Sequence, residues 1–231
     1  MPSVRKKLMF LAGFSASLGT CILIAAIMAT DNWITSSVHC MANSTGNATG
    51  ELQLRYGLFE GVREKLGCPL LIDDGDVKVM ELFGDTNSAK HIHIVVILFT
   101  VLGLVFSFLS TIVTFYNSLS NPYETICGPL SVYACSSVSC IVMFLAMILF
   151  VINTKVNDLS TILVRNSVPQ TTIELKHKSD SYGYSFWLIL LSLALNITSI
   201  VIVYTYQHAN YTKQKEQQRP TEYAPKDVLM Y

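Results

Sequence analysis

The residues best suited to chemistry gather between residues 31 and 93. This stretch holds three aspartates within residues 73–76 and two histidines, His91 and His93. The aspartates surround a glycine, but the spacing of a calcium-binding loop and its distal glutamate are missing, so we interpret them as a solvated acidic turn. The histidines stand two residues apart, which on a helix directs them to different faces. They therefore predict no metal pair, and we expect them at a membrane surface.

No catalytic signature stands elsewhere in the chain. The glycine-rich phosphate and dinucleotide loops, the Gly-x-Ser-x-Gly turn, the His-Glu-x-x-His zinc helix and the Cys-x-x-Cys pair are all missing from the sequence. The sequence therefore predicts no enzyme, no cofactor, no metal and no small-molecule substrate.

Four residues between 40 and 68 predict modifications typical of an extracellular segment. Asn43 and Asn47 begin two neighbouring Asn-x-Ser/Thr sequons, which we expect to carry glycans. Cys40 and Cys68 flank the sequons, and a disulfide between them would close a loop of about 28 residues and stabilise the fold by roughly 3–4 kcal/mol. Both modifications require that this segment face the oxidising side of a membrane.

Three further sites each have two interpretations. Cys127 is either a palmitoylation site or a small packing residue. Asn196 is the most polar residue near the middle of an apolar stretch. We expect it to hydrogen-bond to another helix, and a role in transport is the alternative. The terminal Leu229, Met230 and Tyr231 either bind a PDZ-type groove by strand addition or form an unstructured end.

The distribution of charge predicts the elements that hold these residues. The chain has 231 residues, of which 51% are hydrophobic and 14% charged, whereas soluble domains are about 25% charged. Asp, Glu, Lys and Arg are missing from residues 8–30, 92–116, 127–154 and 182–206. A helix needs about 20 residues to cross the apolar part of a bilayer, and each stretch is longer. The pattern indicates four membrane spans and excludes disorder, nucleic-acid binding and a single soluble domain.

The first of these stretches has a second interpretation as a signal peptide, because three basic residues precede it. Its apolar run is longer than that of a signal peptide and lacks a small-x-small site at its end, so we interpret it as an uncleaved span. The predicted fold class is an all-α membrane protein. It is a bundle of four transmembrane helices with a small, β-containing first loop on the extracellular side.

Charge also predicts how the chain crosses the membrane. Residues 1–7 hold three basic and no acidic side chains, and residues 31–91 hold five basic and nine acidic. Because basic segments stay in the cytoplasm, we expect both termini on the cytoplasmic side of the membrane. Residues 1–7, 117–126 and 207–231 are then cytoplasmic, and the loops 31–91 and 155–181 lie outside.

The first loop carries the pattern of a small sheet. Apolar and polar residues alternate over 52–58, which is typical of a half-buried strand. Residues 34–39 are a weaker strand candidate, and residues 77–83 fit either a strand or a short helix. We expect a small sheet that rests on the bundle.

Within the spans, small residues four apart predict helix contacts. Such pairs are Gly13 with Ser17 and Ser15 with Gly19. Trp33 follows the first span, and we expect it at the apolar–water boundary, where tryptophan is enriched.

The large first loop and its motif resemble those of the claudin and peripheral-myelin-protein superfamily. The motif consists of Trp33, Tyr56, Gly57, Leu58 and Phe59. Claudins have tryptophan where Phe59 stands, and both of their cysteines follow the motif, whereas Cys40 precedes it. The clarins, four-span proteins of the same superfamily, are similar along the whole chain. Their resemblance continues through residues 121–123, 128–129, 182–191 and 222–231.

The resemblance to clarins implies a glycosylated, non-catalytic organiser or adaptor of plasma-membrane domains. Such a protein would link the lipid bilayer, junctional or synaptic membrane partners, PDZ-type scaffolds and the actin cytoskeleton, and the family is associated with the perception of sound. The alternative function is an oligomeric channel or a claudin-like paracellular pore, in which copies of the chain form a homo-oligomer and the acidic first loop selects cations.

Overall fold

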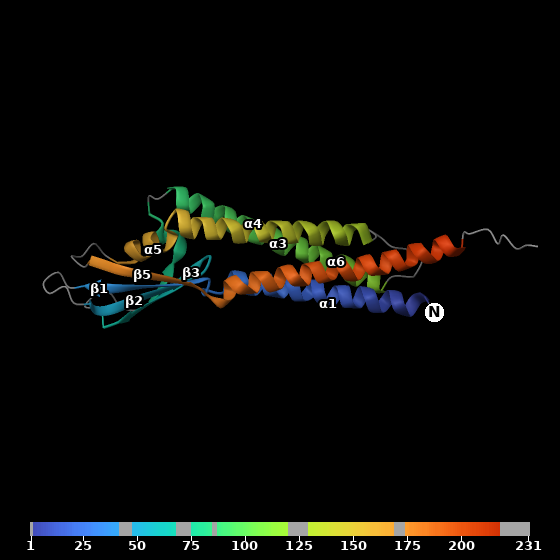
Figure 1. Ribbon diagram of the computed structural model, residues 1–231, viewed down its shortest axis with the longest axis horizontal. Helices are drawn as coiled ribbons and strands as arrows, with labels where there is room; N and C mark the ends of the chain where they lie inside the picture. Colours follow the sequence, from blue (N-terminus) through green and yellow to red (C-terminus); the bar gives the residue numbers. More distant parts are fainter. Residues whose placement is uncertain are drawn as a thin grey trace, which may run out of the picture.

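Four long helices dominate the computed structural model, which describes residues 2–41, 48–67, 75–84, 87–119, 129–168 and 174–217. They are α1 (Pro2–Ala29), α3 (Asn87–Leu119), α4 (Pro129–Val156) and α6 (Tyr184–Gln217) (Figure 1). Each holds an apolar segment long enough to cross a membrane: Lys7–Ala29, Ser88–Leu119, Leu130–Val156 and Tyr184–Ala209. The four apolar helices indicate a multi-pass membrane protein that sits in a lipid bilayer.

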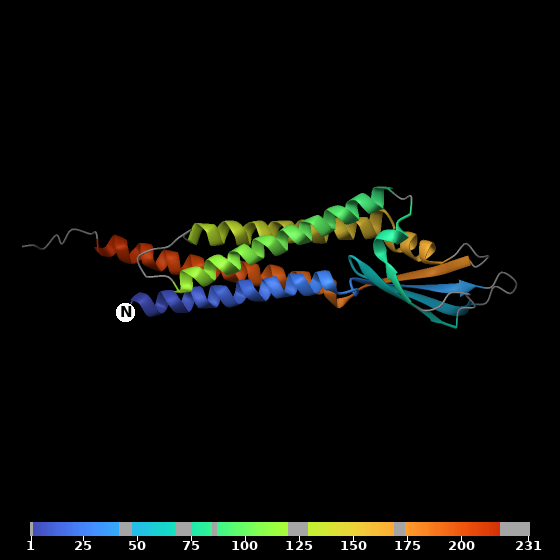
Figure 2. The ribbon, with the colours of Figure 1, turned by 180° about the vertical axis from the view of Figure 1, so that it is seen from behind.

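The long helices pack as a ring in which each contacts two neighbours. α1 packs against α3 and α6, and α4 packs against the same two helices. Helix α1 begins and α6 ends at the end of the bundle away from the sheet (Figure 2). Large apolar side chains cover the outer surface, among them Leu102, Phe108 and Ile197, which are 42%, 54% and 53% exposed. A surface of this kind is stable in lipid and not in water.

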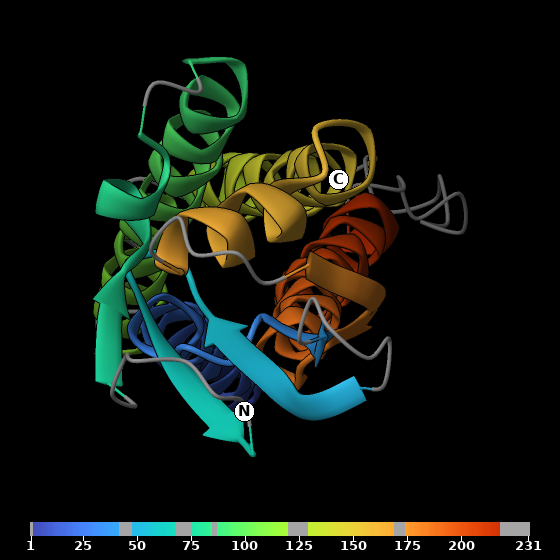
Figure 3. The same ribbon diagram turned by 90° about the vertical axis from the view of Figure 1, so that its left-hand side faces the viewer.

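A five-stranded antiparallel sheet lies at the other end of the bundle. Its strands are β1 (Ile34–Met41), β2 (Ala48–Tyr56), β3 (Glu60–Leu66), β4 (Gly75–Lys78) and β5 (Glu174–Tyr182). Their order in the sheet is β4-β3-β2-β1-β5. Two short helices, α2 (Val79–Leu82) and α5 (Leu159–Ser167), complete this end, and α5 lies across it beside the strands (Figure 3). The fold therefore agrees with the predicted class: four long apolar helices with a small sheet, most of which comes from the loop between α1 and α3.

The structure also resolves the strand predictions one by one. Residues 52–58 overlap β2, in which the alternating Leu52, Leu54 and Tyr56 are at most 1% exposed. Residues 34–39 lie within β1. The ambiguous stretch 77–83 contains both alternatives, because β4 ends at Lys78 and α2 begins at Val79. The fifth strand, β5, comes from the second loop, where no strand was predicted.

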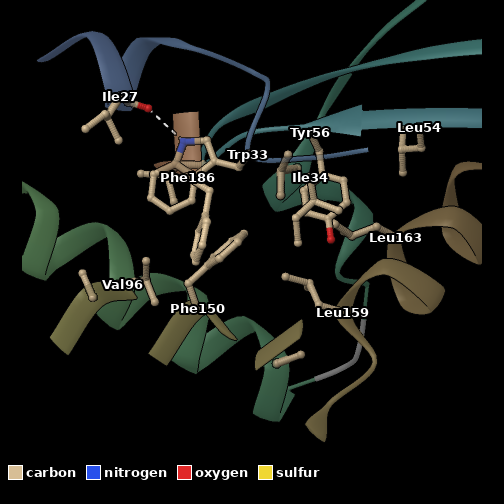
Figure 4. Packing of buried hydrophobic residues seen from close by; sticks show 14 of the residues in the cluster. Ile27, Trp33, Ile34, Leu54, Tyr56, Val96, Phe150, Leu159, Leu163 and Phe186 are labelled. Carbon is tan, nitrogen blue, oxygen red and sulfur yellow. Dashed lines mark hydrogen bonds between the residues drawn. The ribbon is translucent and has the colours of Figure 1, made fainter. Parts of the chain in front are cut away.

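One apolar core continues from the bundle into the underside of the sheet. Trp33 and Phe150 meet edge to face with their ring centroids 4.7 Å apart, and Phe186 lies beside them (Figure 4). The same buried cluster includes Leu54 and Tyr56 of the sheet. Because the core is shared, the sheet and the bundle are packed as one body.

Candidate functional site

The family-type motif residues meet where the sheet joins the bundle, a region we call the joint. Trp33 is fully buried there, and its indole Nε1 donates a hydrogen bond to the carbonyl of Ile27 at 2.9 Å (Figure 4). This carbonyl belongs to the last turn of α1, where helical carbonyls lack a partner within the helix. The ring therefore caps the end of α1 from inside the core. The expected level of Trp33 at the apolar–water boundary stays a prediction.

The backbone of Trp33 also ties together strands from both loops. Its N–H donates to the carbonyl of Tyr56 at 3.1 Å, and its carbonyl accepts from the N–H of Gly183 at 2.8 Å. Tyr56 ends β2, and Gly183 lies between β5 and α6. Trp33 therefore connects the end of β2, in the first loop, with the residue between β5 and α6, at the end of the second loop.

Two glycines allow the chain segments to approach this closely. A Cβ atom at Gly57 would lie 2.3 Å from the carbonyl oxygen of Thr30 and 2.8 Å from the Cα of Asp31. A Cβ atom at Gly183 would lie 2.1 Å from the carbonyl oxygen of Asn32. Contacts this short with backbone atoms cannot be relieved by a rotamer change. Both glycines are therefore required by close backbone approach to the segment that leaves α1.

Tyr56 fastens the sheet to α5. Its hydroxyl shares a hydrogen bond of 2.8 Å with the hydroxyl of Ser160. Burial raises the pKa of the Tyr56 hydroxyl, so the neutral form, which makes this bond, is favoured. On the neighbouring strand the guanidinium of Arg63 donates to the carbonyl of Ser167, the last residue of α5. The sheet is thus held to α5 at two points.

Leu58 and His93 fasten the β2–β3 turn to α3. Leu58 is fully buried, and its carbonyl lies 2.8 Å from Nε2 of His93. Because a carbonyl only accepts, Nε2 carries the proton, and Nδ1 is left buried without a partner. His93 is 0% exposed. The expectation that it marks a membrane surface is therefore wrong.

Phe59, the last motif residue, differs from the other four in its exposure. Its side chain is 42% exposed, although its carbonyl is held by the N–H of Val79 at 2.9 Å. The motif therefore contributes four buried joint residues and one ring that faces outward.

A chain of serine hydroxyls crosses the middle of the bundle. Ser199 and Ser17 lie 3.0 Å apart, Ser17 and Ser110 3.4 Å, and Ser110 and Ser136 2.8 Å. Each serine comes from a different long helix, and none is more than 2% exposed. The predicted contact at Ser17 is confirmed. The prediction for Ser15 is wrong, because its exposed hydroxyl donates to the carbonyl of Ala12 in the same helix.

Asn196 lies near this serine chain, on α6. Its side chain is 1% exposed, and its Nδ2 donates to the hydroxyl of Ser139 on α4 at 3.3 Å. Ser139 in turn donates to the carbonyl of Gly103 on α3 at 2.9 Å. Three helices are linked in this way, and the suggestion that Asn196 makes the bundle specific stays a prediction.

Several predicted sites lie outside the described residues. These are Asn43 and Asn47, Cys68, Cys127 and the terminal residues 229–231. Cys40 lies on β1 opposite Gly50 of β2 and Leu175 of β5, at the end of the sheet away from the joint. In the described ranges, no three His, Cys, Asp or Glu side chains gather where they could hold a metal ion.

The sequence analysis did not predict several residues of the joint. Some of them follow a pattern that could have been recognised, and others do not. Leu159, Leu163 and Val164 have helical spacing and are buried in α5, which the sequence analysis did not predict. No sequence pattern distinguishes His93 from a surface histidine, because its partner is a carbonyl 35 residues earlier. Gly183 likewise becomes informative only once Asn32 is seen beside it.

The joint and the serine chain consist of hydrogen bonds and apolar contacts, and together they position the sheet on the bundle. They do not bring together groups of the described part that would form a nucleophile–base pair.

A family model described as Clarin-2-like matches residues 5–203. The chain is 44% identical to Clarin-3 of Homo sapiens and 43% identical to Clarin-3 of Mus musculus, over the full length of each. It is 31% identical to Clarin-1 of Homo sapiens over 81% of this chain and 82% of that one. The chain therefore belongs to the clarin family.

Proposed function

We propose that the protein is a non-catalytic organiser of the plasma membrane, with both termini in the cytoplasm. The observation that carries this proposal is the joint, where Trp33, Gly57 and Gly183 connect both loops to the ends of α1 and α6. A sheet fastened in this way has a fixed orientation relative to the bilayer. It can present a binding surface to a membrane partner at little cost in conformational entropy.

The serine chain supports an organiser over a conduit through one bundle. Hydroxyls from α1, α3, α4 and α6 meet at 2.8–3.4 Å across the bundle axis. These hydrogen bonds join the four helices at the level where an ion path would have to run. A homo-oligomeric pore between copies of the chain is the alternative that conductance recording tests.

The proposed orientation also suggests roles for the predicted sites that lie outside the described residues. The end of β1 that holds Cys40 lies away from the joint. A Cys40–Cys68 disulfide would tie this end of β1 to the segment that follows β3, and Asn43 and Asn47 would carry their glycans on the same side of the membrane. On the cytoplasmic side, palmitoylation of Cys127 and a PDZ-type contact of residues 229–231 would add attachment to the membrane and to actin-linked scaffolds. The hearing role implied by the family resemblance also remains a proposal.

Proximity labelling of the full chain in a polarised epithelium tests the organiser. A labelling enzyme at the carboxyl terminus should enrich the same membrane and actin-linked scaffold proteins in repeated experiments, relative to an unrelated four-span protein. Recordings from the same cells should give no added conductance. The proposal would be contradicted if labelling enriched no such proteins over the unrelated four-span protein. It would also be contradicted by a current that changes when the first-loop acidic residues Glu60 and Asp76 are neutralised.

A further inference from the structure

A half-open cavity lies beside the joint, on the side where Phe59 faces outward. It has a volume of about 340 Å³ and is lined by Met28, Ala29, Thr30, Asp31, Phe59 and Glu60. Met28 and Ala29 end α1, and Thr30 and Asp31 follow it. Phe59 ends the β2–β3 turn and Glu60 begins β3, and in this turn Gly57 lies directly against Thr30. The cavity is therefore fixed by the same close contact that builds the joint.

The cavity combines negative charge with an aromatic ring. Asp31 and Glu60 contribute carboxylates, and neither makes an ion pair with a basic residue of the described part. Lys78 stands opposite Glu60 in the sheet register, but its ammonium lies 3.4 Å from Glu81. The ring of Phe59 is 42% exposed. Carboxylates beside an accessible aromatic face attract a cation, and this combination suits a quaternary ammonium group.

The position of the cavity indicates which kind of molecule carries such a cation. The apolar span of α1 ends at Ala29. Thr30 and Asp31 follow directly, so the cavity lies at the level of the lipid headgroups next to the sheet. Met28 and Ala29 continue its wall toward the acyl chains. A lipid headgroup can therefore enter the cavity from the membrane while its chains stay in the bilayer.

We propose that this cavity binds the trimethylammonium group of a choline lipid in the leaflet next to the sheet. Phe59 contacts the methyl groups, and the carboxylates of Asp31 and Glu60 attract the positive charge. The volume is at the lower end of the range for small-molecule sites, which matches one headgroup and not a whole lipid. This inference goes beyond the organiser role and does not depend on it.

Native mass spectrometry of the full-length protein tests the site. The protein is equilibrated with phosphatidylcholine, phosphatidylethanolamine and phosphatidylglycerol in equal amounts and with identical acyl chains. The wild type should retain phosphatidylcholine in excess over both other lipids. Phe59→Leu should lower this preference about two- to five-fold, because it keeps an apolar side chain but removes the ring. The double change Asp31→Asn and Glu60→Gln should lower it by a similar factor.

Asp76→Asn is the matched control, because Asp76 is an exposed carboxylate of the same sheet that does not line the cavity. Its lipid preference should equal that of the wild type, and thermal unfolding confirms that each variant is folded. Equal retention of the three lipids by the wild type would overturn the proposal. So would a folded Phe59→Leu protein with unchanged preference. Free choline that protects against unfolding as well as short-chain phosphatidylcholine would show a soluble cation and overturn the lipid assignment.

Discussion

Replacing Gly57 by alanine tests whether the joint holds the sheet to the bundle. The added Cβ would lie 2.3 Å from the carbonyl oxygen of Thr30 and 2.8 Å from the Cα of Asp31. Both atoms belong to the backbone that leaves α1, so relief requires the β2–β3 turn and the end of α1 to separate. That movement would strain the Trp33–Tyr56 backbone hydrogen bond, which spans the same gap.

The size of the effect follows from the number of backbone contacts involved. Overpacking of a well-packed site costs about 1–3 kcal/mol, and a strained hydrogen bond adds about 1 kcal/mol. We therefore expect a loss of about 2–4 kcal/mol in the free energy of unfolding. For a protein of this size, 1 kcal/mol corresponds to about 2–4 °C, so the midpoint of thermal unfolding should fall by about 4–16 °C.

Gly75→Ala is the matched control, because a Cβ atom at Gly75, in the same sheet, would meet nothing within 4 Å. Its unfolding midpoint should stay within about 2 °C of the wild type. Both variants are compared in lipid nanodiscs by intrinsic fluorescence at one scan rate. Equal midpoints for Gly57→Ala and Gly75→Ala would refute the close approach of the turn to α1.

Three further predictions concern the bundle, the sheet and the orientation. Ser17→Ala removes two hydroxyl contacts of the serine chain and should lower the unfolding free energy by about 1–2 kcal/mol, whereas Ser15→Ala, on the exposed face, should leave it unchanged. Tyr56→Phe should cost about 1 kcal/mol at pH 7. Because burial raises the pKa of the Tyr56 hydroxyl above its ordinary value of 10.0, the stability it gives is present below pH 10 and is lost at higher pH. Unfolding at pH 7 and above pH 10 should therefore show an alkaline loss that is smaller in Tyr56→Phe; an equal loss in both proteins would exclude this hydroxyl. Changing Asn43 and Asn47 together to Gln should abolish the glycosidase-sensitive mass shift on gels, and a shift that persists would contradict the proposed orientation.

The helices could be predicted from the sequence because a bilayer leaves little choice. A charged side chain is costly in the apolar layer, so charge-free stretches of sufficient length must cross it as helices. What the charge pattern cannot predict is where a helix ends outside the bilayer. Helix α3 begins at Asn87 and ends at Leu119, and α6 continues to Gln217, beyond the predicted 92–116 and 182–206. Hydrogen bonding within the helix continues wherever water or headgroups solvate its polar side chains.

The joint could be predicted only in part, because its contacts are long-range and many involve backbone atoms. The alternation over residues 52–58 revealed β2, since one face of that strand is buried. Strand β5 has the polar sequence Glu-Leu-Lys-His-Lys-Ser-Asp-Ser-Tyr and lies at the edge of the sheet, so it shows no alternation. A tryptophan directly after a membrane span is equally typical of the membrane surface, so the sequence did not indicate that Trp33 is buried. Its buried position follows from two long-range contacts, the hydrogen bond of its indole to the carbonyl of Ile27 and the packing of its ring against Phe150.

We infer that the joint fixes the sheet so that the protein can organise its partners. Quantitative co-purification of the partners found by proximity labelling tests this, with the wild type, Gly57→Ala and Gly75→Ala compared at matched amounts on the cell surface. We expect Gly75→Ala to retain the membrane partners at the wild-type level and Gly57→Ala to lose them. Retention of the same partners by Gly57→Ala, with its joint shown to be destabilised, would refute this role of the joint.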